Sequence, residues 1–230
     1  MGEAYIIDAV RTPVGRRGGG LAEEHPADLG AHAIKGLIDR VGIDPMTVDD
    51  VIMGCLDNMG PQAGDIARTA WLAAGMPEAI PGVTVDRQCG SGQQAVSFAA
   101  MGVMSGVQDI VIAGGMQNMS LIPIGSAMDV MGHESIGRPD IEDPFSTSKG
   151  WVERYGTQEV SQFRGAELIA KKWNLERQDL EEFALESHER AARAQDEGRF
   201  DNEILPYGDV DQDEGVRRGT TLEKMAQLPT

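Results

Sequence analysis

The sequence has 230 residues, a hydrophobic fraction of 41% and a formal net charge of −17. This composition permits a sizeable core in one large domain or two small ones, and the acidic balance disfavours non-specific binding to nucleic acid, which depends on clustered lysine and arginine. Two cysteines are too few for a disulfide framework, no apolar run approaches the ~18 residues of a membrane span, and no signal segment opens the chain, so a cytoplasmic setting without membrane contact is predicted.

Short apolar runs and helical patterns alternate along the first half of the chain. Runs rich in valine and isoleucine predict strands over residues 4–10, 49–55, 82–86 and 109–115. Apolar residues at helical spacing predict helices over residues 27–42, 64–75 and 91–106, the first of them ending at Gly42. Strands separated by helices predict an α/β fold, with helices packed on the faces of a mostly parallel sheet.

Cys89 stands between a predicted strand and a predicted helix, in the motif "VDRQCGSGQQA". Ligands gather at the carboxyl ends of parallel strands, and the N–H groups of a helix N-terminus favour a thiolate and an oxyanion. We expect Gly90 and Gly92 to let the chain turn sharply there. Cys89 is therefore a candidate nucleophile, although a small buried cysteine beside a tight turn is the alternative.

The other cysteine, Cys55, also follows a predicted strand. No glycine-flanked helix start comes directly after it, so we predict that Cys55 packs in the core.

The second half begins with a long stretch, residues 114–160, in which apolar residues follow neither helical nor strand periodicity for long. Such a stretch is usually functional, and methionine side chains suit a binding surface; the alternative is filler between core elements. The methionines considered for such a surface are Met116, Met119, Met128 and Met131. Two helices are predicted after it, over residues 163–173 and 176–198, the second with an apolar face that includes Leu180 and Phe183.

Other motifs predict little. The histidines His25, His32, His133 and His188 do not have metal-ligand spacing, so no metal site is predicted. The segment "CGSGQQA" lacks the Lys-Ser/Thr ending of a phosphate loop and the glycine spacing of a dinucleotide fingerprint, so a nucleotide-dependent oxidoreductase is a weak alternative.

The chain resembles the N-terminal part of a thiolase, a coenzyme-A-dependent acyltransferase. The resemblance is carried by "GPQAGDIARTAWLAAG", "VDRQCGSGQQA", "VIAGGMQNMS" and "DEGVRRGTTLEKMAQL". Within the family, the chain is most similar to actinobacterial thiolases of steroid side-chain breakdown. It implies a thiolase-like fold with an N-terminal core over residues 1–117, a loop domain over residues 118–230, and a C-terminal half that is absent. It also implies a homo-oligomer, a dimer or a tetramer.

The resemblance implies thiolytic cleavage of a 3-ketoacyl-CoA or the reverse condensation. In the breakdown direction, Cys89 attacks the 3-keto carbon and becomes acylated before a second coenzyme A removes the acyl group. No covalently bound cofactor is implied, because coenzyme A is the substrate. Arg217 matches the family's arginine that packs on the adenine of coenzyme A, with Arg218 as a possible error of register. Ser161 and Gln162 stand where most thiolases have His-Met, which favours a bulky acyl chain over acetoacetyl.

The resemblance also implies what these residues lack. The last strand of the sheet, the histidine base, an asparagine of one oxyanion hole and the second catalytic cysteine belong to parts of the family pattern without a counterpart here. We therefore expect that the 230 residues alone do not turn over. The alternative function is a catalytically incomplete module that binds coenzyme A or a protein partner.

Overall fold

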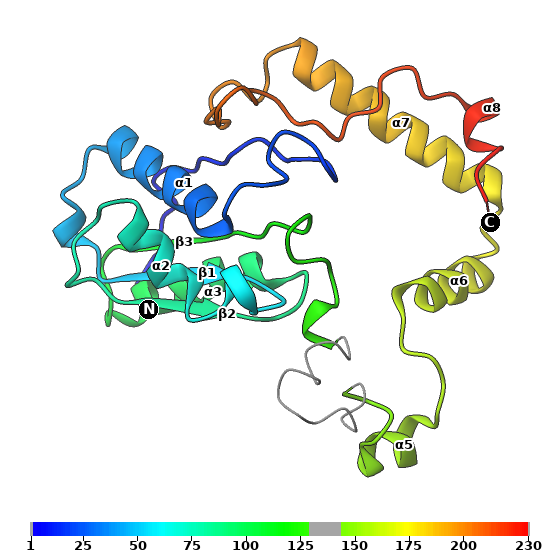
Figure 1. The fold of residues 1–230 in the computed structure, drawn as a ribbon, viewed down its shortest axis with the longest axis horizontal. Coiled ribbons are helices and arrows are strands. Elements are labelled where there is room, and N and C mark those ends of the chain that lie inside the picture. Colours follow the sequence, from blue (N-terminus) through cyan, green and yellow to red (C-terminus); the bar gives the residue numbers. More distant parts are fainter. Residues whose placement is uncertain (1, 129–143, 230) are drawn as a thin grey trace. The chain divides into compact units, whose positions relative to one another are not determined.

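The computed structural model describes residues 2–128 and 144–229. They belong to two compact units, Met1–Ala127 with Phe200–Gly215 and Met128–Arg199 with Val216–Thr230. The elements of each unit are labelled in Figure 1, and each unit is described by itself. Met131 and His133, considered above, lie outside the described residues.

The first unit is built on a parallel sheet of three strands, β1 (Asp50–Gly54), β2 (Gly82–Val85) and β3 (Val111–Gly115). β1 lies in the middle and pairs in parallel with both neighbours. Three of the predicted strands are therefore confirmed, and so is the α/β class. All three carboxyl ends point to the same edge of the sheet, which is where a site is expected.

Successive residues of β1 belong to two different hydrophobic clusters of the unit. Val51 and Met53 belong to the core that includes α1 (Pro26–Val41) and α2 (Ile66–Ala73). Ile52 packs instead with Ala95 and Ala99 of α3 (Ser91–Ser105). This alternation is the period of two that a pleated strand imposes, and it gives helices on both faces of the sheet.

The ends of α1 show why the sequence forms this helix. His25 precedes it, and its Nδ1 accepts a hydrogen bond from the N–H of Ala27 at 3.2 Å. Gly42 ends it in the left-handed region, at φ 72°, and donates its N–H to the carbonyl of Ile38 at 2.8 Å. The predicted stop at Gly42 is confirmed, because a left-handed position favours glycine.

The strand predicted over residues 4–10 is wrong. The segment has no sheet pairing among the described residues, and the side chains of Tyr5, Ile6 and Ile7 are 74%, 80% and 78% exposed. A strand needs a hydrogen-bonded neighbour, and among the described residues this segment pairs with none of the three strands of the sheet. Apolar composition alone therefore did not suffice to make this run a strand.

Residues 200–215 return to the first unit and run beside the segment that precedes α1. The N–H of Arg11 donates to the carbonyl of Glu203 at 2.8 Å, and the N–H of Leu205 donates to the carbonyl of Arg11 at 2.8 Å. Tyr207 donates its hydroxyl to a Glu24 carboxylate oxygen at 3.0 Å. These contacts join residues that are distant in sequence, so no local pattern predicts them.

The second unit is helical in the part that is described. It contains α5 (Lys149–Tyr155), α6 (Gln162–Trp173), α7 (Arg177–Asp196) and α8 (Leu222–Met225). α6 and α7 confirm the two predicted helices, whereas α5 lies in the stretch that the sequence left without a period. On the expected apolar face of α7, Leu180 and Phe183 are 51% and 75% exposed.

Among the described residues, three short 3-10 turns connect the larger elements, at Pro45–Thr47, Gly60–Gln62 and Ser126–Met128. None of the helices described is both long enough and apolar enough to cross a membrane.

Candidate active site

The carboxyl ends of the three strands meet around a cavity of about 250 Å³. β1 leads into Cys55, β2 leads through a short turn into Cys89, and β3 leads into Met116 and Gln117, all of which line this cavity. Cys89 is exposed and Cys55 is buried. The edge of the sheet where a site was predicted therefore carries a hollow with an exposed thiol in its wall, and a catalytic role of that thiol stays a prediction.

The turn that carries Cys89 is held by its own side chains. Ser91 accepts a hydrogen bond from the N–H of Arg87 at 2.9 Å and donates its hydroxyl to the carbonyl of Gln88. Asp86 accepts from the N–H of Gln88 at 2.9 Å. Hydrogen bonds on both sides of Cys89 fix the backbone that positions its thiol.

The sharp bend falls at Gln88 rather than at the glycines. Gln88 has φ 51°, in the left-handed region that a non-glycine residue rarely adopts, whereas Gly90 has φ −89°. The expectation that Gly90 and Gly92 supply the bend is wrong, because the hydrogen bonds of Asp86 and Ser91 hold Gln88 in that conformation instead.

Close approach of backbones occurs at Gly54, the last residue of β1. A Cβ atom placed on Gly54 would lie 2.3 Å from the backbone of Ser91 and Gly92. Only glycine allows β1 to touch the start of α3 in this way. The contact brings Cys55 and the Cys89 turn to one cavity.

The start of α3 supplies the electrostatics of the site. The N–H of Gln94 makes an intrahelical bond to the carbonyl of Gly90 at 2.9 Å, and the N–H groups of a first helical turn have no partner within their helix. With the helix dipole they favour negative charge on a thiolate or an oxyanion beside Cys89. Across the part of the chain that the structure describes, no cluster of three potential metal ligands is found.

Cys55 is buried, whereas Cys89 is exposed. It belongs to the core cluster, and its thiol donates to the carbonyl of Leu56 at 3.4 Å. Burial, and then the nearby carboxylates of Asp86 and Asp57, raise the pKa of the Cys55 thiol to about 11. The prediction that Cys55 packs in the core is confirmed, and its thiol stays protonated at neutral pH.

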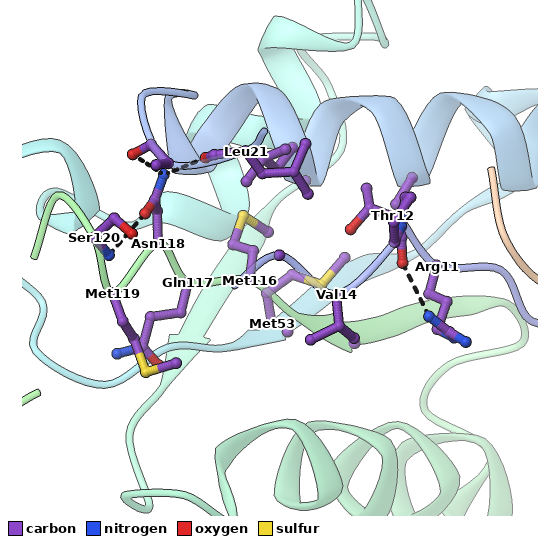
Figure 2. A pocket seen from close by; sticks show the side chains of 18 of the residues that line it. Arg11, Thr12, Val14, Leu21, Met53, Met116, Gln117, Asn118, Met119 and Ser120 are labelled. Carbon is purple, nitrogen blue, oxygen red and sulfur yellow. Dashed lines mark hydrogen bonds between the residues drawn. The ribbon is translucent and has the colours of Figure 1, made fainter. Parts of the chain in front are cut away.

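A larger cavity, of about 930 Å³, runs along the open edge of β3 beside the loop that precedes α1 (Figure 2). Its wall includes Arg11 and Val14 of that loop and Met116 after β3, which also lines the Cys89 cavity. No cysteine lines the larger cavity, so both thiols of the chain border the smaller one.

The turn after β3 lines both cavities and is anchored by hydrogen bonds. Asn118 donates its side-chain amide to the carbonyls of Leu21 and Ala22 at 3.0 and 3.1 Å, and its N–H donates to Gln62 Oε1 at 2.9 Å. Figure 2 shows Asn118 reaching away from Gln117 toward this anchor. Gln117 is thus held at the cavity of Cys89 by its neighbour.

The methionines expected on a binding surface divide by burial. Met116 is buried in the core of the first unit, whereas Met119 and Met128 are 54% and 43% exposed. Only the last two are available as a surface.

Ser161 and Gln162 lie at the start of α6 in the second unit. The Ser161 hydroxyl caps this helix by accepting a hydrogen bond from the N–H of Arg164 at 3.1 Å, and Gln162 is exposed as the first helical residue. Ser161 therefore has a local structural task, and a role of either residue in an acyl pocket stays a prediction.

The two neighbouring arginines of the second unit are used differently. Arg218 forms an ion pair with Asp196 at 2.9 Å. Arg217 is exposed, and its guanidinium has no ion-pair partner within residues 144–229, while its backbone N–H donates to His188 Nδ1 at 3.3 Å. Arg217 is thus the one whose guanidinium remains available for a ligand.

Sequence reasoning missed the residues that shape the Cys89 turn. Asp86 stands two residues before the N–H that it binds, the spacing of a side-chain turn, and Ser91 is the first residue of α3. Both signals were present in the motif. The left-handed Gln88 left no signal, because glutamine has no preference for that conformation.

Comparison with known proteins gives consistent results. The thiolase N-terminal domain family matches residues 4–230. The chain is 59% identical to a steroid 3-ketoacyl-CoA thiolase of Mycobacterium tuberculosis, over 99% of this chain and 56% of that protein. It is 39% identical to a β-ketoadipyl-CoA thiolase of Pseudomonas aeruginosa, over 98% of this chain and 59% of that protein.

A solved structure agrees in fold. The acetyl-CoA acetyltransferase of Bacillus anthracis superposes with a TM-score of 0.75 at 30% identity, covering 97% of this chain and 57% of that one. The chain therefore spans somewhat more than half the length of the relatives it matches.

Proposed function

The chain belongs to the thiolase family, and from this premise we propose that it forms the part of a 3-ketoacyl-CoA thiolase that carries the acyl-accepting cysteine, Cys89. The observation that carries the proposal is the exposed Cys89 thiol in a cavity at the N-terminus of α3. Membership of the family gives the acyltransferase class, and the residues of the cavity support the step assigned to them here.

In the proposed reaction, the Cys89 thiolate attacks the 3-keto carbon of a 3-ketoacyl-CoA. The bond between C2 and C3 then breaks, its electron pair leaves with acetyl-CoA as an enolate, and that enolate takes a proton. The acyl group stays on Cys89 as a thioester until the thiol of a second coenzyme A displaces it, which makes the chemistry ping-pong. The start of α3 favours the thiolate and the oxyanion of the first step.

Coenzyme A is proposed to contact the second unit through Arg217. Its guanidinium is exposed and without an ion-pair partner in the described part of that unit, and such a plane suits both stacking on adenine and phosphate binding. The predicted division into a core over residues 1–117 and a loop domain over residues 118–230 belongs to the same proposal. A cytoplasmic homo-oligomer likewise stays a prediction.

A bulky acyl chain is the proposed substrate. Support comes from the 59% identity to a steroid 3-ketoacyl-CoA thiolase and from Ser161 and Gln162 in place of His-Met. The test joins this chain to the part of the relatives beyond the match and compares kcat/KM for a steroid side-chain 3-ketoacyl-CoA with kcat/KM for acetoacetyl-CoA. A higher value for acetoacetyl-CoA would overturn the substrate assignment.

The acyl-acceptor role has its own test in the present chain. After incubation with an acyl-CoA, intact-mass analysis is expected to show one acyl group on the wild type and on Cys55→Ala, and none on Cys89→Ala. If acyl-CoA binds but the mass of the protein does not increase, the alternative of a coenzyme-A-binding module is favoured. Acylation of Cys55 instead would contradict the proposal.

A further inference from the structure

The turn that presents Arg217 is held against one face of α7. It contacts His188, Ala192, Gln195 and Asp196, which have the i, i+4, i+7 and i+8 spacing of a single helical face. Arg218 supplies most of these contacts, through Asp196, the side chain of Gln195 at 3.2 Å and the carbonyl of Ala192 at 3.4 Å. The far side of the turn is fixed by Lys224, which donates to the carbonyl of Gly219 at 2.7 Å.

His188 makes the contact that acts on Arg217 itself. Its Nδ1 accepts the backbone N–H of Arg217 at 3.3 Å, which requires an Nδ1 without a proton. The Arg217 guanidinium extends from the same residue and is not tied to α7 by an ion pair among the described residues. The direction of that side chain therefore depends on a backbone that a histidine holds.

We propose that His188 is a positioning residue for coenzyme A, and that it orients Arg217 only while its imidazole is neutral. The inference rests on the proposed role of Arg217. Histidine changes charge between about pH 5 and 8. Its protonated ring carries a hydrogen on Nδ1, cannot accept the Arg217 N–H, and adds a positive charge beside two arginines.

The charges around His188 come from three elements, and they do not replace the lost bond. At three and four residues from His188, α7 carries only alanine and leucine. The charged residues of the packed elements are Arg217 and Arg218 on the turn, Glu223 and Lys224 on α8, and, on α7, Arg177, Asp179, Glu181, Glu182, Glu186, Glu189, Arg190, Arg193 and Asp196. Asp196 is paired with Arg218, so the groups that approach His188 from the turn are cationic.

The first experiment measures coenzyme A affinity by calorimetry near pH 7.5 and near pH 5.5. Two variants are compared with the wild type: His188→Asn, which keeps an acceptor near the position of Nδ1 but does not titrate, and His188→Leu, which removes it. Wild-type affinity is expected to fall about threefold to tenfold at the lower pH, the range of one hydrogen bond. His188→Leu is expected to be weak at both values.

His188→Asn is the matched control, because any change with pH in the charge of coenzyme A affects the wild type and this variant equally. It is expected to keep near-wild-type affinity with less pH dependence than the wild type. An equal pH dependence in His188→Asn would overturn the inference. So would tighter wild-type binding at the lower pH, which would mean that the imidazolium attracts the phosphates of coenzyme A directly.

The second experiment needs no ligand. Hydrogen exchange of the Arg217 amide, expressed as a protection factor, is expected to drop at the lower pH in the wild type, to stay constant in His188→Asn and to be low throughout in His188→Leu. Constant protection in the wild type would overturn the inference. If the wild type and both variants all fail to bind coenzyme A, the proposed role of Arg217 is refuted. The protection factors would still decide whether His188 holds the turn.

Discussion

At the scale of single residues, the two cysteines show how environment separates thiols of the same intrinsic chemistry. Both line one cavity at the ends of β1 and β2. Cys55 is 2% exposed and Cys89 is exposed. The proposed nucleophile, Cys89, is therefore distinguished from Cys55 by access and by the helix N-terminus beside it, and not by proximity to the cavity alone.

The first prediction follows from the Cys55 thiol, whose pKa of about 11 leaves about one molecule in a thousand as thiolate at pH 8. Brief treatment of the native protein with iodoacetamide is expected to label Cys89 and to leave Cys55 unmodified until the protein is unfolded. Peptide mass spectrometry reads both sites. Preferential labelling of Cys55 in the native protein would contradict the assignment, and Cys89→Ala serves as the control.

At the scale of elements, the turn between β2 and α3 depends on one hydroxyl. Ser91 is 5% exposed and bonds to both Arg87 and Gln88. It thereby holds a non-glycine residue in the left-handed region directly before the nucleophile.

The second prediction is that Ser91→Ala lowers the free energy of unfolding by about 1–3 kcal/mol, because the Arg87 N–H loses its partner. It is also expected to change the alkylation rate of Cys89, since the turn is no longer fixed. Urea unfolding and iodoacetamide kinetics measure the two effects. Ser97→Ala on the same helix, where the hydroxyl only bonds back to the carbonyl of Gln93, is expected to change neither; equal behaviour of the two variants would refute the role of Ser91.

A second element-scale feature is the attachment of residues 200–215 to the first unit. Arg11 binds both carboxylate oxygens of Asp213, at 2.6 and 3.0 Å, and the N–H of Val14 donates to the same carboxylate at 2.8 Å. Burial by itself would raise the pKa of Asp213, but the hydrogen bonds from Arg11 and Val14 outweigh it and hold that pKa below its ordinary value.

The third prediction concerns acid stability. Because the pKa of Asp213 is lowered in the folded state, its stabilisation is fully present above its unfolded pKa, near 4, and is lost as the pH falls through the folded value. Asp213→Asn is expected to cost about 2 kcal/mol of unfolding free energy at pH 7, and the difference from wild type is expected to shrink below about pH 4. The exposed Asp211→Asn is the control; a difference that persists unchanged in acid would contradict the ion-pair explanation.

At the scale of the whole molecule, the described residues contain the proposed nucleophile, Cys89, but no proposed base beside it. No histidine lines the cavity of Cys89 in the part of the chain that the structure describes. The chain spans 56% of its steroid thiolase relative, so the remaining groups are proposed to come from the part of the family pattern beyond the match.

The fourth prediction is that the 230 residues alone do not catalyse repeated thiolysis. General acid–base assistance is typically worth about 10²–10⁴ in rate, and an oxyanion donor about 10²–10³. A thiolysis assay paired with intact-mass analysis of the same sample checks this, with the joined full-length protein as the active control. If a sample whose intact mass is that of the 230 residues has the thiolase activity of the joined protein, the prediction is wrong.

The sequence by itself determined the elements that carry their own local signals. β1, β2 and β3, with α1, α2 and α3, follow from apolar periodicity and helix-ending glycines, and so does the place of Cys89 between a strand and a helix. The catalytic role of Cys89 stays a prediction. The resemblance to thiolases added the chemistry. Each of these depends on neighbours within a few positions along the chain.

Only the tertiary structure decided the features that depend on distant partners. Residues 4–10 have the composition of a strand and are not one, since pairing needs a neighbour that no local pattern supplies. Arg217 and Arg218 are neighbouring arginines whose contacts the sequence does not distinguish. Contacts with α7 assign the ion pair to Arg218 and leave the guanidinium of Arg217 available. Gln88 bends the chain because Asp86 and Ser91 hold it there, a cooperation of side chains that residue preferences alone do not predict.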